Sequence, residues 1–329
     1  MDKYQVDIAV AIVFFNRDDS LKEVFERVRA AKPSKLFLIQ DGARANREGE
    51  YEDILKCRKV FENIDWECEV YRNFSDENLG CGRRVSSGIS WVFEHVDRAI
   101  ILEDDCIIEP TFIPFCAELL EKYKDDRRIS MISGLNHFND WECGGNSYFF
   151  TKTGAIAAWA TWKRSWEDFD FAVSRIADPY TQKLLSMEFG HKYAARARIR
   201  QWLRIQEQYK KGETARFWGP QWGFTKYAGN GLVIVPAHSL SSNVGVNAKA
   251  TFSGGGLEFM QRGMRGWFFQ KTRPMEFPLK HPRVFLCDRK YDKKYYDITY
   301  PPRIKGRAIR VYYFLKRKIY GIVFRKRIK

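Results

Sequence analysis

The sequence predicts an α/β fold in which a mostly parallel sheet is flanked by helices. Strand-like and helix-like stretches alternate along the first third of the 329 residues, as they do when helices cover such a sheet. The strand candidates are near-continuous apolar runs, which is typical of strands buried on both faces. Hydrophobic residues make up 45% of the chain, so a sizeable core can form, and the composition does not indicate disorder.

The first elements are predicted from the spacing of their apolar residues. The run over residues 6–15 is expected to be a strand rather than a signal peptide, because it lacks a basic leader and a small-residue cleavage site. The helix that follows ends before Pro33, since proline cannot continue a helix. The βαβαβ series comprises a strand at 6–15, a helix at 20–31, a strand at 35–40, a helix at 51–63 and a strand at 67–72.

An acidic run marks the expected site. A glycine-containing loop over residues 78–82 leads into a helix that carries Arg83 and Arg84 on its first turn, and the strand after it (98–102) ends in Glu103-Asp104-Asp105. Ligands of open α/β sheets bind at the carboxyl ends of strands. Further along, we expect a helix from Pro110 to about residue 123, a strand at 129–133, a mainly helical stretch at 178–209 and a strand at 231–235.

One main domain, residues 1–280, is expected, followed by a linker and a basic amphipathic helical tail over 281–329. Residues 303–329 carry eleven Lys or Arg and no acid, which leaves about +4 of the net charge of +15 for the rest. Aromatic residues interleaved with these bases are typical of helices that lie on anionic membrane surfaces. A helix packed on the main domain is the alternative. No nucleic-acid-binding motif accompanies the charge, so nucleic acid is not an expected partner.

The cysteines and the hydropathy pattern indicate the compartment. Seven scattered cysteines with no CxxC pair favour neither a disulfide framework nor a zinc site, and they fit a reducing cytosol. No apolar stretch reaches the roughly 18 to 20 residues that a membrane-spanning helix needs. We therefore expect a cytoplasmic protein that is peripheral at the inner membrane face.

The acidic run predicts a metal site. Three adjacent carboxylates at the end of a buried strand repel one another and are costly to desolvate unless a cation compensates them. Mg²⁺ or Mn²⁺ prefers such oxygen ligands and can bridge a carboxylate to a diphosphate. The alternative is a solvated acidic turn before Pro110, but the strand before the run and the helix after it favour the metal site.

Several segments resemble, in the same order, the GT-A fold nucleotide-sugar glycosyltransferases, in particular the N-acetylglucosaminyltransferase I-like group and bacterial family-2-like relatives. The resemblance covers roughly residues 6–250. It rests on AVAIVFFNRDDSLKEVFERV, LFLIQDGA, ENLGCGRRVSSGISWVFEHV, ILEDDCIIEPTFIPFCAELLEKY, WATWKRSWEDF and NGLVIVPAHSLSSNVG. It implies a GT-A (Rossmann-like) domain that binds Mn²⁺ or Mg²⁺ and a nucleotide-diphosphate-sugar, with a UDP-sugar the expected donor.

The resemblance also assigns roles to single residues. Glu103 and Asp105 are the expected catalytic residues, because Glu103 corresponds to a residue facing the donor sugar and Asp105 to the direct metal ligand. His238, after a short strand, matches a further metal ligand of some relatives, although a lone histidine is more often structural. Arg83 matches a basic position near the donor phosphates. The expected donor-binding residues are Asn16, Arg17, Asp41, Asn78, Gly80, Arg83 and Asp104.

The general base is not evident. Relatives often read Trp-Asp-x-Gln-Trp where this chain has Trp218-Gly219-Pro220-Gln221-Trp222. In an inverting transferase that acid would take the proton of the acceptor hydroxyl. Without it, the proton acceptor could be one of the nearby acids, and the candidates are Glu188, Glu207, Glu213 and Asp168.

The sequence thus favours a metal-dependent glycosyltransferase, inverting by resemblance, that transfers sugar to a glycan or lipid-linked acceptor in bacterial surface polysaccharide synthesis. A degenerate transferase acting as a membrane-surface binding module is one alternative, prompted by Gly219. A sugar nucleotidyltransferase is another, but such enzymes carry a glycine-rich loop after the first strand, and residues 14–19 contain no glycine.

Overall fold

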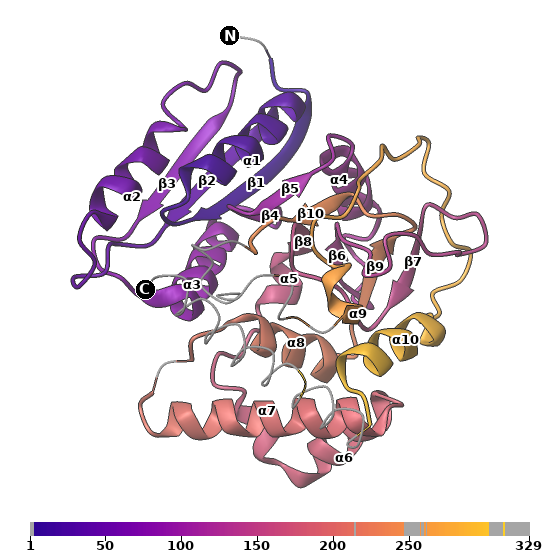
Figure 1. Cartoon of the computed structure of the whole chain (residues 1–329). Coiled ribbons are helices and arrows are strands. Elements are labelled where there is room, and N and C mark those ends of the chain that lie inside the picture. The colour runs from indigo at the N-terminus through magenta and orange to yellow at the C-terminus, as the bar shows by residue number, and fades with distance from the viewer. Residues whose placement is uncertain are drawn as a thin grey trace.

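The computed structural model describes residues 3–213, 215–246, 257, 260, 262–302 and 312. An eight-stranded sheet forms its centre, with helices on both faces (Figure 1). In spatial order the strands are β3 (Glu69–Phe74), β2 (Pro33–Gln40), β1 (Val6–Phe14), β4 (Arg98–Glu103), β8 (Trp159–Trp162), β6 (Ile129–Ser133), β9 (Leu232–Pro236) and β7 (Tyr148–Thr151).

The sheet is mostly parallel, as predicted. Strands β3, β2, β1 and β4 run in one direction. Strand β8 is antiparallel to both β4 and β6, so β6 again shares the direction of β4, and β9 is parallel to β6. Strand β7 at the edge is antiparallel to β9. The α/β class and the parallel order of the first strands are therefore confirmed.

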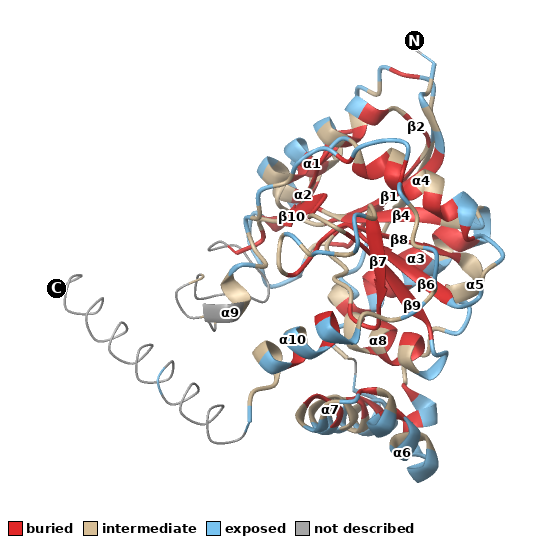
Figure 2. Cartoon of the chain, turned by 90° about the vertical axis from the view of Figure 1, so that its right-hand side faces the viewer, coloured by how far each residue is buried: buried red, intermediate tan, exposed pale blue. Residues whose placement is uncertain are grey.

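Side chains along a strand alternate between its two faces, so each face of the sheet packs against a different set of helices. In β1, Val10 and Ile12 belong to a core cluster with α1 (Asp18–Ala31) and α4 (Phe112–Lys122), whereas Ala11 packs in a second cluster with α3 (Gly80–His95). Figure 2 shows the central strands almost wholly buried, whereas the edge strand β3 has no fully buried residue. The remaining helices of the first half and the middle are α2 (Glu50–Lys59), α5 (Lys163–Trp166) and the short 3-10 helix η1 (Ser174–Ala177).

A helical layer lies below the sheet in the view of Figure 1. It contains α6 (Pro179–Glu188), α7 (Lys192–Lys210), α8 (Gly219–Ala228) and α10 (Arg289–Thr299), while α9 (Arg262–Arg265) is short. A third core cluster joins these helices through side chains such as Trp202, Phe224 and Tyr296.

Helix α10 lies within the segment 281–329, which was expected to hold a linker and a basic tail, and the division of the chain at residue 280 stays a prediction. Tyr291 of this helix is fully buried, and its hydroxyl accepts a hydrogen bond from the backbone of His137 at 2.9 Å. Asp292 is buried as well. Tyr291, Tyr295 and Tyr296 of α10 are spaced as on one face of a helix. The lysines and aspartates between them make the segment polar on average, so its apolar face is not evident from composition.

A small second sheet brings two distant segments together. Strand β10 (Ser241–Asn243) pairs antiparallel with β5 (Cys106–Ile108), so that Asn243 lies opposite Cys106. Because β5 directly follows the acidic run, this pairing carries Asn243 to the site predicted from the sequence.

Three expectations concern membranes and thiols. Among the helices described, none is both long and apolar enough to cross a bilayer. The basic tail at 303–329 lies outside the described residues except for Tyr312, so its predicted membrane contact stays a prediction. All seven cysteines are free thiols.

Leu38 provides a test of the central sheet. It is fully buried in β2, so Leu38→Ala should lower the free energy of unfolding by about 2 to 5 kcal/mol through lost burial and a residual cavity. Leu184→Ala, at a position 48% exposed on α6, should change it by less than about 0.5 kcal/mol. Urea unfolding measures both, and equal effects would contradict the core assignment.

Candidate functional site

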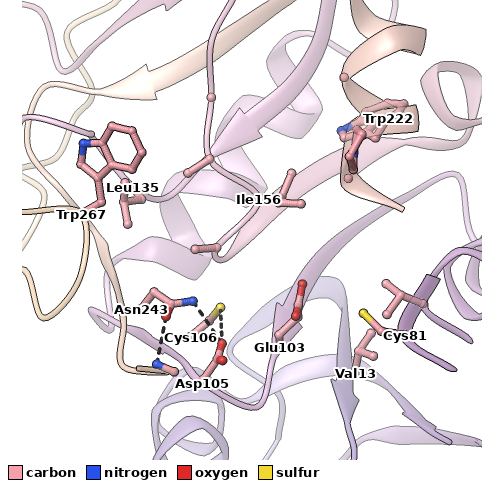
Figure 3. Close-up of a pocket in the computed structure, with 18 of the residues that line it drawn as sticks. Val13, Cys81, Glu103, Asp105, Cys106, Leu135, Ile156, Trp222, Asn243 and Trp267 are labelled. Atoms are coloured by element: carbon pink, nitrogen blue, oxygen red, sulfur yellow. Dashed lines mark hydrogen bonds between the residues drawn. The ribbon is translucent and has the colours of Figure 1, made fainter. Parts of the chain in front are cut away.

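A cavity of about 760 Å³ opens at the carboxyl ends of β1, β2 and β4. The sheet supplies one wall, and α3, α7, α8 and α10 supply others (Figure 3). Of the residues predicted from the sequence to form the site, Arg17, Asp41, Asn78, Gly80, Glu103, Asp104 and Asp105 line this cavity, whereas Asn16, Arg83 and His238 do not.

The acidic run is compensated by an arginine of the chain itself. The pairing of β1 with β4 sets Val13 beside Glu103, which brings the segment after β1 onto the acids. Arg17 forms an ion pair with Asp104, and its Nη1 lies 3.0 Å from Oδ2 of Asp105. Although burial lowers the pKa of Arg17, the charges of Asp104 and Asp105 raise it above the ordinary value. Asp104 also accepts a hydrogen bond from the backbone of Phe15 at 3.2 Å.

Glu103 differs from its neighbours. Its carboxylate has no hydrogen-bond partner among the described residues, and Figure 3 shows it on the same wall of the cavity as Asp105, with Ile156 and Trp222 across from it. Burial first, and then the negative charges of Asp105 and Asp104, raise the pKa of Glu103 above its ordinary value. A carboxylate held this way accepts protons more readily than a solvated one.

Asn243 and Gly245 are site residues that the sequence reasoning missed. Nδ2 of Asn243 donates to Oδ1 of Asp105 at 3.2 Å, and Oδ1 of Asn243 accepts from the backbone of Gly245 at 2.9 Å. A Cβ at position 245 would collide with Oδ2 of Asp105, so only glycine fits there without a shift. Asn243 lies 138 residues from Asp105 in sequence, and no local pattern could have connected them.

A carboxylate of the chain already binds the start of α3. Asp41 accepts hydrogen bonds from the backbone of Leu79 at 2.8 Å and of Gly80 at 2.9 Å. Two of the amides at this helix N-terminus are therefore already paired. Gly80 has a φ of 75°, a left-handed conformation that favours glycine.

The two arginines of α3 lie in opposite environments. Arg83 is exposed and outside the cavity lining, so its expected role near the donor phosphates stays a prediction. Arg84 is buried and lines the cavity. Its Nε donates to the backbone oxygen of Gln40 at 3.1 Å and its Nη2 to Oδ1 of Asn73 at 2.8 Å, which ties α3 to the ends of β2 and β3.

Three other predicted residues have structural contacts. Asn16 donates to the buried Glu50 at 3.1 Å, and Asn78 donates to the backbone oxygen of Gly42 at 2.7 Å. Nε2 of His238 lies 3.3 Å from the backbone oxygen of Pro274. Their proposed ligand contacts stay predictions.

The fit of a divalent ion is partial. Asp105 and the amide oxygen of Asn243 are oxygen donors of the kind that Mg²⁺ or Mn²⁺ prefers. However, Arg17 is already bound to Asp105, and in the described part of the chain no three His, Cys, Asp or Glu side chains gather into a metal-binding group.

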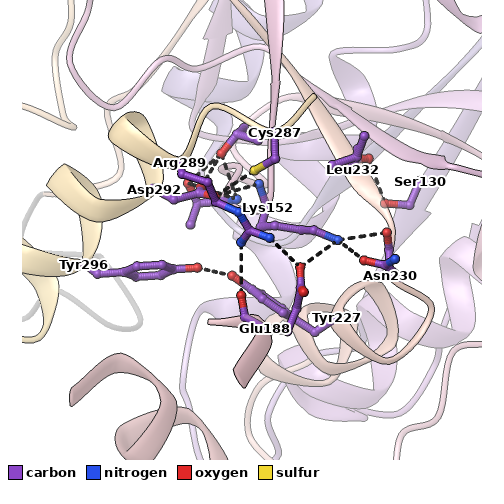
Figure 4. Close-up of polar contacts among 12 residues, drawn as sticks. Ser130, Lys152, Glu188, Tyr227, Asn230, Leu232, Cys287, Arg289, Asp292 and Tyr296 are labelled. Carbon is purple, nitrogen blue, oxygen red and sulfur yellow. Dashed lines mark hydrogen bonds and ion pairs between the residues drawn. The ribbon is translucent and has the colours of Figure 1, made fainter. Parts of the chain in front are cut away.

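None of the four acids considered as general base lines the cavity. Glu188 instead pairs with Lys152 at 3.2 Å and with Arg289 at 3.1 Å (Figure 4), and Glu207 pairs with Lys211 at 2.9 Å. The acids among the described lining residues are Asp41, Glu103, Asp104 and Asp105. Because Asp41, Asp104 and Asp105 have partners, Glu103 is the acid in this set without one.

Basic and aromatic residues line another part of the cavity. Arg198 of α7 and Lys226 of α8 contribute positive charge there, together with His137, Trp267 and Tyr295. Burial, and then the charge of Lys226, lower the pKa of His137 to about 3, so His137 is neutral at physiological pH. Burial and the nearby Arg198 lower the pKa of Lys226 to about 7, partly opposed by Asp292.

The fold and this site define an α/β protein with a ligand-sized cavity that is acidic at the strand ends and basic on the helices. Neither family models nor curated proteins give a match to the sequence. Among solved structures, a mannosyltransferase from Pyrobaculum calidifontis in complex with GDP-mannose and Mn²⁺ is similar with a TM-score of 0.34 and 11% identity, over 49% of this chain and 46% of that one. The chain thus covers less than half of that protein.

Two further structures are similar at the same low level. A UDP-glucose pyrophosphorylase complexed with UDP-glucose gives a TM-score of 0.38 and 10% identity, over 76% of this chain and 95% of that one. A UTP-bound UGPase from Acinetobacter baumannii gives 0.31 and 12%, over 49% and 77%. Similarities this low establish neither a family nor an activity.

Lys226 predicts a pH dependence of stability. Its pKa is lower in the folded chain than the ordinary 10.5, so between pH 7 and 10.5 the unfolded chain binds the extra proton and stability rises with pH. Lys226→Met should remove this contribution, which is at most about 1.4 kcal/mol per pH unit. Urea unfolding at several pH values measures it, with the exposed Arg200→Gln on α7 as the control; an unchanged slope in Lys226→Met would contradict the assignment.

Proposed function

We propose that this protein is a metal-dependent glycosyltransferase that transfers a sugar from a nucleotide-diphosphate-sugar to a glycan or lipid-linked acceptor. The observation that carries the proposal is the acidic run at the end of β4, which lines a cavity large enough for such a donor. The ordered segments that resemble GT-A transferases support the same conclusion. Bacterial surface polysaccharide synthesis at the inner membrane face is the proposed setting, and a UDP-sugar the proposed donor.

The donor would lie across the carboxyl ends of β1, β2 and β4. Asp104 is held by Arg17 and by the backbone of Phe15, and this fixed carboxylate would accept a hydrogen bond from the ribose. Asp41 and Asn78 line the cavity at the start of α3, where the base would be bound. Arg17 brings a positive charge to the acids and would also attract the diphosphate.

Asp105 and Asn243 would hold the metal ion. A bound Mn²⁺ or Mg²⁺ would supply positive charge that stabilises the nucleotide diphosphate as leaving group. Arg17 would then give up its contact with Asp105 while it keeps the one with Asp104. The pairing of β10 with β5 brings Asn243 beside Asp105, and its amide oxygen, which accepts a hydrogen bond from Gly245, would have to turn toward the ion.

Glu103 would act as the general base. It is the acid without a hydrogen-bond partner among the described residues of the lining, and its raised pKa suits it to take the proton of the acceptor hydroxyl as that oxygen attacks the anomeric carbon. Position 219, where the transferases that the sequence resembles often carry an acid, is a glycine here. Glu103 on the opposite wall would then be the proton acceptor in place of that acid.

Asp105→Asn tests the metal site. Calorimetry of UDP binding with and without Mn²⁺ should show that Mn²⁺ strengthens binding to the natural chain, and Asp105→Asn should lose about tenfold or more of this gain, because a neutral amide is a weaker ligand. Asp168→Asn, at an exposed position outside the cavity lining, is the control. UDP binding that is equally strong without Mn²⁺ and in Asp105→Asn would refute the metal site.

Glu103→Gln tests the general base. Once a panel of nucleotide-sugars has identified a donor by thermal stabilisation, Glu103→Gln should lower kcat by about 10² to 10⁴, while UDP affinity changes far less. The rate of the natural enzyme should rise with pH as Glu103 loses its proton, and Glu103→Gln should lack this rise. Glu207→Gln, an exposed position, should leave kcat unchanged, and full activity of Glu103→Gln would exclude the role.

A further inference from the structure

Two cations near the helical wall of the cavity have no acidic partner in the described part of the chain. Lys226 is only 6% exposed, and the contact of its Nζ is the sulfur of Met131 at 3.6 Å. Arg198 donates from Nη1 to the neutral Gln201 at 3.0 Å. A buried ammonium group without a carboxylate is costly, because it loses its hydration and gains nothing comparable.

Lys152 shows how this fold treats a lysine with a structural role. It is buried to a similar extent, at 4% exposed, but its Nζ lies 3.2 Å from the carboxylate of Glu188 and donates to the backbone oxygen of Asn230 at 2.9 Å (Figure 4). Among the described residues, Lys226 has no comparable set of partners. Its ammonium group therefore has room for a partner that these residues do not supply.

The nearest acid is already engaged. Asp292 influences Lys226 electrostatically, but its carboxylate accepts hydrogen bonds from both the hydroxyl and the backbone of Thr153, at 2.9 and 3.1 Å, and from the backbone of Lys152 at 3.2 Å. Asp292 also accepts from Thr151 and from the thiol of Cys287. The hydroxyl groups of Tyr227, Tyr295, Tyr296 and Tyr300 lie around Arg198, and no carboxylate of the described residues pairs with it.

Aromatic surface accompanies the two cations. The ring of Trp267 stacks on Tyr295 with centroids 5.3 Å apart, and it lies edge-on to His137 at 5.0 Å. Nε1 of Trp267 is buried and has no hydrogen-bond partner among the described residues, although an indole N–H normally finds one when buried. An aromatic ring with an unused donor, next to unpaired positive charge, suits a ring-shaped polar ligand that carries a negative group.

We propose that this part of the cavity is a subsite for an anionic sugar unit, whose carboxylate or phosphate binds Lys226 and Arg198 and whose ring lies against Trp267. Resting on the proposed function, the inference names this sugar as the acceptor of the transfer, because Asp41, Asp104 and Asp105 at the strand ends are assigned to the donor and its metal ion. The shared chemistry is a single negative group on a sugar, supplied by a uronate or by a phosphosugar.

The test is calorimetric titration of the full chain with glucuronate, glucose 6-phosphate and glucose. At least one anionic sugar should bind, and glucose should bind at least about tenfold more weakly, because it leaves both cations unpaired. Preference for glucuronate would identify a carboxylate as the natural group, and preference for glucose 6-phosphate a phosphate. Binding of both anions no tighter than glucose would overturn the proposal.

Variants connect the binding to the residues. Lys226→Met should weaken binding of the preferred anion about tenfold or more, yet retain or raise Tm, because it removes an unpaired buried charge. Arg198→Gln should weaken the same ligand, whereas Arg200→Gln, an exposed arginine on the same helix, should not. Undiminished anion binding by both Lys226→Met and Arg198→Gln would overturn the subsite.

A separate titration of the natural chain with UDP and Mn²⁺ distinguishes failure of the subsite from failure of the proposed function. Binding of UDP together with equal affinity for glucose and the anionic sugars would leave the transferase proposal intact and remove the subsite. Anion binding that depends on Lys226, without any binding of UDP, would support the subsite and refute the nucleotide-sugar transferase.

Discussion

Negative charge at the end of β4 is the constraint on which the site depends. Glu103, Asp104 and Asp105 are placed there by a strand whose residues 99–102 are buried in the core, so they cannot separate into solvent. The neighbouring parallel strand β1 supplies the compensating positive charge, because the segment after β1 places Arg17 against Asp104 and Asp105. The acids that would bind a ligand are therefore held by the register of two parallel strands.

The second constraint is the opposite charge on the helical wall. The ends of β1, β2 and β4 contribute carboxylates to the cavity, whereas α7 and α8 contribute Arg198 and Lys226. A cavity divided in this way can orient a ligand pair, since the metal ion of a bound donor would meet the carboxylates and an anionic sugar would meet the cations. Under the proposed function, this division would keep the donor and the acceptor apart until both are bound.

The parallel half of the fold could be predicted because its information is local. Apolar runs and helical spacing fixed β1, α1 and β2 to within a few residues, and the acidic run followed from its place after an apolar strand. What could not be predicted depends on contacts between distant segments. Asn243 meets Asp105 only through the pairing of β10 with β5, and Tyr291 is buried because the distant Phe138, Trp141 and Phe149 pack against its ring. Asp41 as the partner of the α3 amides was also out of reach, since no sequence pattern shows which acid faces a helix end.

The position of Lys226 suggests a reason for the glycine at position 219. The two positions are seven residues apart on α8, which is two turns, so they lie on the same face of the helix, and both line the cavity. In relatives, the resemblance places an acid at position 219, and a carboxylate there would repel an anionic acceptor bound at Lys226. A glycine at position 219 leaves this helix face with a lysine and no carboxylate. Under the proposed function, this face would accept an anionic sugar, and Glu103 on the opposite wall would accept the proton.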